Sequence, residues 1–170
     1  MSKVSVDLNS LLVRHADIDD APIILAIFLE SEAQADFKGG ITLASVLDWI
    51  DCSTDKFPLL VVCHEGELIG WCASESFYGV PALEGVAEIA IYIKTAWHRL
   101  GIGAWLLRYL NQYALKHQLH TFVAHVLEAN VTSQRFFLQQ GYEQWGCLPS
   151  VARSGGVKGD LILLGRHIEL

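Results

Sequence analysis

The chain alternates between short apolar runs and amphipathic stretches, and the spacing of the apolar residues predicts which are strands and which are helices. The unbroken apolar run Ile89–Ile93 predicts a buried strand. A short basic loop follows it and ends in Gly101-Ile-Gly103. Beyond the loop, apolar and aromatic residues recur with the 3.6-residue period of one helix face: Ile102, Trp105, Leu106, Tyr109, Leu110, Tyr113 and His117. A buried strand should therefore lead through a glycine loop into a helix.

The remaining segments predict a mixed chain of helices and strands. One helix should be capped by Asp19 or Asp20, contain Pro22 in its first turn and end near Ala33. Others should start near Thr42, with Val46, Leu47 and Ile50 on one face, and span Val131–Gln140. Strands are expected at Leu11–His15, Leu59–His64, Glu67–Ser76, Glu88–Lys94, Thr121–Val126, Tyr142–Leu148 and Asp160–Glu169, the last two separated by the loop Arg153–Gly156. With no repeat or linker, residues 1–170 should form one domain, in which residues 1–10 are an N-terminal extension.

Composition narrows the class of protein. A hydrophobic content of 52% in 170 residues supports a packed core. The net charge of −7, without a basic block, argues against a nucleic-acid-binding protein. No apolar run has the length of a membrane span or signal segment, so we expect a cytoplasmic protein with no membrane partner. The four cysteines should be free thiols, and His117 and His120 lack a nearby third ligand, so no metal site is expected.

The start of the helix after Gly101 can bind an anion. The first turn of a helix has free N–H groups and a positive dipole end, and the glycines let a phosphate approach the backbone. Arg99 adds a positive charge beside it. A dinucleotide site remains an alternative because Glu128 lies at a suitable distance for a ribose carboxylate, but the third glycine of that fingerprint is replaced by Leu106. A capped turn without a ligand is the other alternative.

The residues around this loop resemble the GNAT family of N-acetyltransferases. The stretch H98-R-L-G-I-G103 is similar to the (Q/R)-x-x-G-x-(G/A) loop with which that family holds the diphosphate of acetyl-coenzyme A. Asn130-Val-Thr-Ser133 and Gly141-Tyr142 fit a downstream block of the family. The resemblance is strongest to the phosphinothricin and methionine sulfone or sulfoximine acetyltransferase group. It rests there on Val13-Arg14, Phe57-Pro58, Glu65–Trp71, Gly146–Pro149, Gly156 and Asp160, and covers Leu12 to Leu170.

The resemblance implies an α+β fold, with a central mixed, mostly antiparallel sheet splayed between its fourth and fifth strands and flanked by about four helices. It also implies a homodimer that transfers an acetyl group from acetyl-coenzyme A to a small primary amine. The backbone of Ile91, Tyr92 and Ile93 would pair with the pantetheine arm. The other coenzyme-binding residues implied by the motifs are His98, Arg99, Leu100, Gly101, Ile102, Gly103, Asn130 and Ser133.

Glu88 is the expected general base. Acetyl transfer needs a neutral amine, so a nearby group must take its proton. A carboxylate at the start of an apolar strand is partly desolvated, which raises its pKa toward neutrality. The conserved glutamate of the subfamily also falls at Glu88. We further expect Phe28, Phe77 and Tyr78 to contact the substrate.

Two departures from the family pattern affect this expectation. Phe137 stands where many relatives have a Tyr, and this subgroup a His, that can donate a proton. The loop Ser74–Gly85 contains Glu75 and Glu84 but no Lys or Arg, so the site should favour amines without a carboxylate. These departures leave a non-catalytic acyl-coenzyme A-binding module as the alternative to an enzyme.

Overall fold

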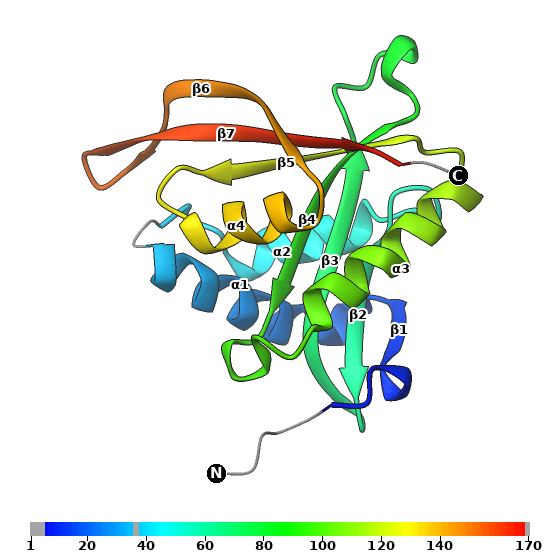
Figure 1. Cartoon of the computed structure of the whole chain (residues 1–170). Helices are drawn as coiled ribbons and strands as arrows, with labels where there is room; N and C mark the ends of the chain where they lie inside the picture. The colour runs from blue at the N-terminus through cyan, green and yellow to red at the C-terminus, as the bar shows by residue number, and fades with distance from the viewer. Residues whose placement is uncertain (1–5, 36–37, 169–170) are drawn as a thin grey trace.

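A seven-stranded mixed sheet runs through the middle of the molecule, as the computed structural model shows for residues 6–35 and 38–168 (Figure 1). The strands lie in the order β1-β2-β3-β4-β5-β7-β6. Only the β4–β5 pair is parallel, so the sheet is mixed and mostly antiparallel, as predicted. The strands are β1 (Leu12–His15), β2 (Leu59–His64), β3 (Glu67–Ser76), β4 (Val86–Ile93), β5 (Thr121–Leu127), β6 (Glu143–Ser154) and β7 (Val157–His167).

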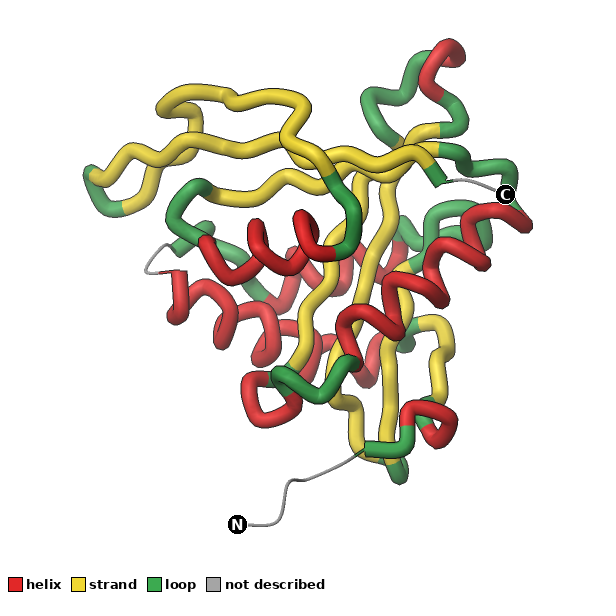
Figure 2. Tube along the Cα trace, viewed as in Figure 1, coloured by secondary structure: helices red, strands yellow, loops and turns green. Residues whose placement is uncertain are grey.

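Helices cover both faces of the sheet (Figure 2). The helices α1 (Ala21–Ala35) and α2 (Leu43–Asp51) lie on one face and bury a cluster that includes Ile24 and Trp71. The helices α3 (Ile102–Lys116) and α4 (Val131–Gln139) lie on the other face, over the larger core. This arrangement confirms the predicted fold class. It differs from the parallel sheet of a dinucleotide-binding domain, so the dinucleotide alternative fails on topology.

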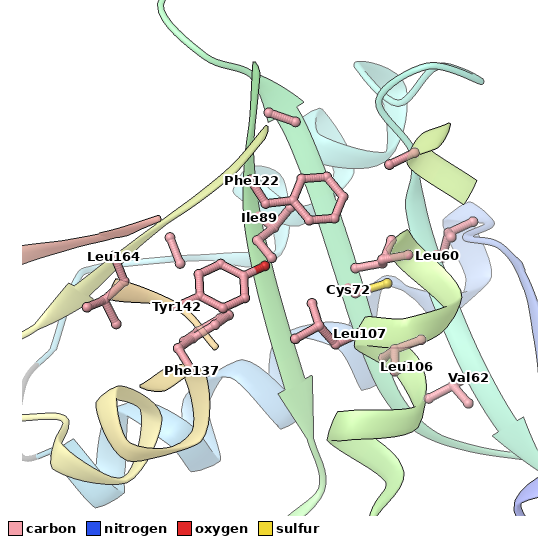
Figure 3. Close-up of a cluster of buried hydrophobic side chains, with 14 of the residues drawn as sticks. Leu60, Val62, Cys72, Ile89, Leu106, Leu107, Phe122, Phe137, Tyr142 and Leu164 are labelled. Carbon is pink, nitrogen blue, oxygen red and sulfur yellow. The ribbon is translucent and has the colours of Figure 1, made fainter. Parts of the chain in front are cut away.

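The larger core is built from alternate strand residues and one stripe of α3. Figure 3 shows Ile89 and Phe122 from the sheet facing Leu106 and Leu107 of the helix. The buried stripe of α3 consists of Ile102, Leu106, Leu107, Leu110 and Ala114. The prediction of this face was partly wrong, because the aromatic residues assigned to it lie at its edge, half-buried and stacked along the helix: Trp105, Tyr109, Tyr113 and His117.

β4 and β5 separate soon after they begin. They pair at three positions, from Val86↔Thr121 to Glu88↔Val123. β4 continues to Ile93 and β5 to Leu127 without further pairing between them among the described residues. Figure 1 shows the two strands diverging, with β4 leading to the start of α3 and β5 to the start of α4. The predicted splay between the fourth and fifth strands is therefore confirmed.

Several element boundaries differ from the predictions. β4 begins at Val86, so Glu88 lies inside a strand rather than at its start. A capping box of Asp17 with Asp20 starts the turn before α1, in place of a cap at Asp19 or Asp20. Arg153 belongs to β6, because the β6–β7 hairpin extends to a tight turn at Gly155-Gly156. The predicted last strand reaches Glu169, which lies outside the described residues.

Candidate active site

Glu88 lies in a row of polar side chains that crosses three strands where β4 and β5 begin to separate. Its strand partner on β3 is Glu75. On the other side, Oε1 of Glu88 lies 2.6 Å from Nδ1 of His125, a residue of β5 beyond the last paired position. The side chains of Glu88 and His125 keep 40% and 23% of their surface exposed. Phe77 stacks on the imidazole with its ring centroid 6.4 Å away. The row is therefore partly desolvated but open to a small molecule.

The environment of the row raises the pKa of Glu75. Partial burial, and then the negative charge of Glu88, raise the pKa of Glu75 above its ordinary value. Glu75 therefore takes up a proton at higher pH than an ordinary glutamic acid.

One backbone edge of β4 is free of strand pairing from Ile89 to Ile93. The N–H of Lys94 donates to Ile69 of β3, and the carbonyl of Val86 accepts from Phe77, so even-numbered residues direct their backbone groups toward β3. Alternation along a strand then directs the backbone groups of Ile89, Ile91 and Ile93 into the gap next to β5. An extended chain could pair with this edge as an additional strand.

The loop between β4 and α3 leads from this edge to a helix N-terminus. Gly101 is the N-cap residue, with φ +81°, and no side chain caps the helix there. The first helix-type bond from this end joins the N–H of Trp105 to the carbonyl of Gly101, so the N–H groups of Ile102 and Gly103 have no intrahelical acceptor. Arg99 is exposed and forms no ion pair with any residue that the structure describes. The uncapped helix start is therefore present as predicted, and its binding of an anion stays a prediction.

Two of the expected coenzyme-binding residues have structural partners. Nε2 of His98 lies 2.7 Å from the carbonyl oxygen of Ile93, so the imidazole fixes the loop against the end of β4. Asn130 caps α4 by accepting a hydrogen bond from the N–H of Ser133 at 3.1 Å. Leu100 is half-buried against the core that Ile102 completes. These residues thus belong to the end of β4, the loop that follows it, the first turn of α3 and the start of α4.

Phe137 belongs to the hydrophobic core. It is 4% exposed, and its ring packs edge-on against Tyr142 at a centroid distance of 5.0 Å (Figure 3). The hydroxyl of Tyr142 is buried without a hydrogen-bond partner among the described residues. Burial raises the pKa of this phenol. Position 137 therefore contributes packing and no proton.

A pocket of about 610 Å³ opens on the α1–α2 face of the sheet, next to the polar row. Its wall includes Glu75, the strand partner of Glu88 on β3. It also includes Ala90, which is the next residue after Glu88 on the same face of β4. Five of its sixteen lining residues are aromatic, and the charged lining residues, Asp48 and Glu75, are both acidic. The aromatic lining residues are Phe28, Trp49, Phe57, Trp71 and Tyr92. Burial, with the charges of Glu32 and Glu88, raises the pKa of Tyr92 to about 12, so this phenol stays neutral.

The structure separates the three residues expected to contact substrate. Phe28 lines the pocket, whereas Phe77 is not part of the wall and stacks on His125. Tyr78 is 83% exposed with φ +62° and lies outside the pocket wall. Glu84 is also outside the wall and pairs with Lys56 at 3.3 Å.

Sequence reasoning missed His125, Asp48 and Trp49. His125 occupies an otherwise apolar strand, a signal that could have identified it. The periodic pattern of the second helix could likewise have placed Trp49 beside Val46, since both pack into the α1–α2 cluster. Leu47, predicted on that face, is instead 38% exposed.

Comparisons with known proteins agree with the fold described above. Residues 26–142 match the sequence model of the Acetyltransferase (GNAT) family. A Bacillus subtilis protein provisionally named as a phosphinothricin acetyltransferase is 29% identical over 93% of this chain and 98% of its own. A crystal structure with the same provisional assignment is 30% identical, with a TM-score of 0.84 over 95% of this chain and 100% of the other. The fold is also that of a Sinorhizobium meliloti phosphinothricin acetyltransferase in complex with acetyl-coenzyme A, at 22% identity and a TM-score of 0.79 over 94% and 89% of the two chains.

The described residues contain no group of three or more His, Cys, Asp or Glu side chains arranged to hold a metal ion. Within residues 6–35 and 38–168, no helix has the length and apolar character to cross a bilayer.

Proposed function

Because the chain belongs to the acetyltransferase (GNAT) family, we propose that it transfers an acetyl group from acetyl-coenzyme A to the primary amine of a small molecule. One observation carries the proposal: the splay between β4 and β5 joins three parts of a site for this reaction. The free edge of β4 leads in one direction to the uncapped start of α3. On one face of the sheet, the polar row centred on Glu88 adjoins the aromatic pocket.

The residues of the splay fit the chemistry of the coenzyme. The N–H groups at the start of α3 and the guanidinium of Arg99 would hold the diphosphate. The backbone of Ile91, with that of Ile93, would pair with the amides of the pantetheine arm, which otherwise lose hydrogen bonds with water. Asn130 and Ser133 at the start of α4 would flank the same arm. When bound, acetyl-coenzyme A supplies the activated acetyl thioester.

The polar row provides the acid–base chemistry. An amine is mostly protonated at neutral pH and must lose a proton before it attacks. Glu88, with the imidazole of His125 beside it at 2.6 Å, is the candidate proton acceptor next to the pocket. A backbone N–H on the free edge of β4 would stabilise the negative charge that develops on the thioester oxygen.

The pocket favours a positively charged acceptor. Asp48 and Glu75 place negative charge in its wall, and no Lys or Arg lines that wall among the described residues. Aromatic faces attract cations and bury an apolar body. We therefore assign the acceptor class as amines without a carboxylate next to the nitrogen. This class differs from phosphinothricin, the amino acid in the names of the relatives.

Turnover with a panel of amines tests the proposed function. Release of free thiol from acetyl-coenzyme A should depend on both an amine and the enzyme. The panel should include polyamines, amino-acid amides, short peptides, phosphinothricin and methionine sulfone. Tight coenzyme binding without turnover of any amine would support the non-catalytic binding module and reject the enzyme.

We also propose a homodimer in the cytoplasm with no nucleic-acid partner. β6 is the terminal strand of the sheet, and exposed apolar residues lie along the β6–β7 hairpin, among them Leu148, Val151 and Val157. Such an edge supports association with a second copy. Sedimentation at micromolar concentration should give about twice the monomer mass of 18.8 kDa. A monomer under these conditions would contradict the proposal.

A further inference from the structure

The aromatic pocket reaches from the sheet to the C-terminal end of α2. On the sheet it is lined by Glu75 of β3, the strand partner of Glu88. On the helix side it is lined by Asp48 in the last turn of α2 and by Cys52, the C-cap residue. A ligand that fills this pocket of about 610 Å³ therefore meets acidic side chains from two separate elements.

The last turn of α2 carries charges that are unfavourable for the end of a helix. A helix C-terminus has partial negative charge and is stabilised by basic side chains nearby. The last turn of α2 reads Asp48-Trp-Ile-Asp51 and has no basic residue. Both aspartates are exposed, and neither forms an ion pair with any residue that the structure describes. A bound cation at this end of the pocket would remove the repulsion.

The positive side chain next to the pocket is already paired. Lys56 lies with its Nζ atom 5.7 Å from the ring centroid of Phe57, which is a lining residue. Its ammonium pairs with Glu84 at 3.3 Å, and Lys56 is not part of the wall. The negative charge of the wall therefore lacks a counter-ion from the described part of the chain.

Four aromatic rings form an apolar part of the wall before any ligand arrives. Each ring contacts two of the others, at centroid distances between 4.5 and 5.9 Å: Phe28, Trp49, Trp71 and Tyr92. These contacts fix the positions of the rings. Aromatic faces attract cations and can cover a methylene chain. The rings thus suit an elongated apolar molecule with positive charge.

We infer that the acceptor is an aliphatic diamine or polyamine, and that Asp48 binds the ammonium group that does not react. This inference rests on the proposed function and names the substrate class of its pocket. One amino group loses its proton near Glu88 and takes the acetyl group. The other stays protonated at neutral pH and pairs with Asp48, while the methylene chain lies on the aromatic rings. Asp48 is therefore the residue that distinguishes a diamine from a monoamine.

Matched acceptors and matched variants test this assignment. Diaminobutane and butylamine differ only in the second amino group, and the wild type should favour the diamine in kcat/KM by about tenfold or more. Asp48→Asn keeps the size of the side chain and removes its charge. It should lower this ratio about fivefold or more, mainly through a higher KM for the diamine, because the ion pair forms equally in the ground and transition states. Asp51→Asn removes the same charge from the same helix turn, outside the pocket wall, and should keep the ratio near its wild-type value.

Two outcomes of these kinetics would overturn the inference. Equal kcat/KM values for the two amines in the wild type would show that the second ammonium is not recognised, although acetylation of both would leave the proposed function standing. An equal fall of the ratio in Asp48→Asn and Asp51→Asn would show a general effect of negative charge at the end of α2 and no specific pairing with Asp48.

The thiol of Cys52 gives a second readout that does not depend on turnover. Cys52 is exposed and lines the pocket, whereas Cys147 of β6 is exposed outside the pocket wall. With desulfo-coenzyme A present, diaminobutane should slow the alkylation of Cys52 by iodoacetamide about threefold or more, as followed by mass spectrometry. The alkylation of Cys147 should not change, and Asp48→Asn should lose the protection of Cys52.

Unchanged alkylation of Cys52 in the wild type at every diamine concentration would overturn the inference. If the wild type acetylates no amine, the proposed function fails, whereas the protection of Cys52 still decides whether a diamine binds beside Asp48.

Discussion

Gly103 on α3 packs against the ring of Phe136 on α4. A Cβ atom at Gly103 would lie 3.1 Å from Cε2 and 3.4 Å from Cζ of that ring. The glycine therefore allows the start of α3 to approach α4 closely, in addition to leaving the backbone N–H open to a phosphate. We predict that Gly103→Val raises the KM for acetyl-coenzyme A about tenfold or more and lowers the melting temperature, because the larger side chain fills both spaces.

A second substitution separates the two effects. Phe136→Leu in the Gly103→Val background removes the crowding ring, so it should restore much of the melting temperature. The KM should stay high, since valine still obstructs the helix start. Recovery of both quantities would show that Gly103 serves helix packing alone and would remove the phosphate cradle from the proposal.

The acceptor preference can be measured with pairs of compounds that differ in one carboxylate. We expect the carboxamide of methionine sulfone to exceed the free amino acid in kcat/KM by at least about tenfold, or about 1.4 kcal/mol. The reason is that Asp48 and Glu75 repel a carboxylate and attract a cation in a partly desolvated pocket. The double variant Asp48→Asn/Glu75→Gln should reduce this ratio of kcat/KM values. Preference for phosphinothricin or methionine sulfone over all other amines of the panel would contradict this expectation.

The raised pKa of Glu75 predicts a pH-dependent stability. A carboxyl group that binds its proton more tightly in the folded state makes the folded state less stable as pH rises, from its unfolded value of about 4.5 through its higher folded value. Glu75→Gln removes this effect, so the variant should melt at a higher temperature than the wild type at pH 7 and at about the same temperature near pH 4. A difference in melting temperature that does not change with pH would show that the surroundings do not raise the pKa of Glu75.

Arg14 and Asp20 connect β1 to the beginning of α1 in a way that also depends on pH. Two guanidinium nitrogens of Arg14 donate to the two carboxylate oxygens of Asp20 at 2.7 and 2.9 Å, and the N–H of Asp17 donates at 2.8 Å. The bonds from Arg14 hold the pKa of Asp20 below its usual range. Asp20→Asn should therefore lower the free energy of unfolding by roughly 1–3 kcal/mol at pH 6.

The pH dependence of this loss follows from the lowered pKa. The stabilisation is complete above the unfolded value of about 3.8 and is lost as pH falls through the lower folded value. Urea titrations at pH 6 and at the lowest pH where the protein folds give the free energy of unfolding of wild type and Asp20→Asn. The difference between the two proteins should be smaller at the lower pH. Arg14→Lys, which keeps the charge but cannot donate two parallel bonds, should show part of the same loss.

Local features of the site could be predicted from the sequence. The strand, glycine loop and helix around Gly101 follow from apolar spacing and from the free N–H groups of any helix start, which are properties of neighbouring residues. Asn130 is a helix cap for the same reason. The replacement of a proton-carrying side chain by Phe137 was likewise visible in the sequence, and the structure adds that this residue packs in the core.

Relations between distant segments needed the tertiary structure. Glu88 and His125 meet only because β4 and β5 pair in parallel in one register and then separate, and neither the register nor the point of separation is encoded in the spacing of either strand. The acceptor pocket similarly combines Asp48 of α2 with Glu75 of β3, and its wall excludes Tyr78 and Glu84 of the loop that was expected to supply it. The sequence by itself therefore determined the glycine loop, the uncapped start of α3 and the elements that form the sheet. The tertiary packing decided which side chains share the site, because those contacts depend on how whole elements are placed against one another.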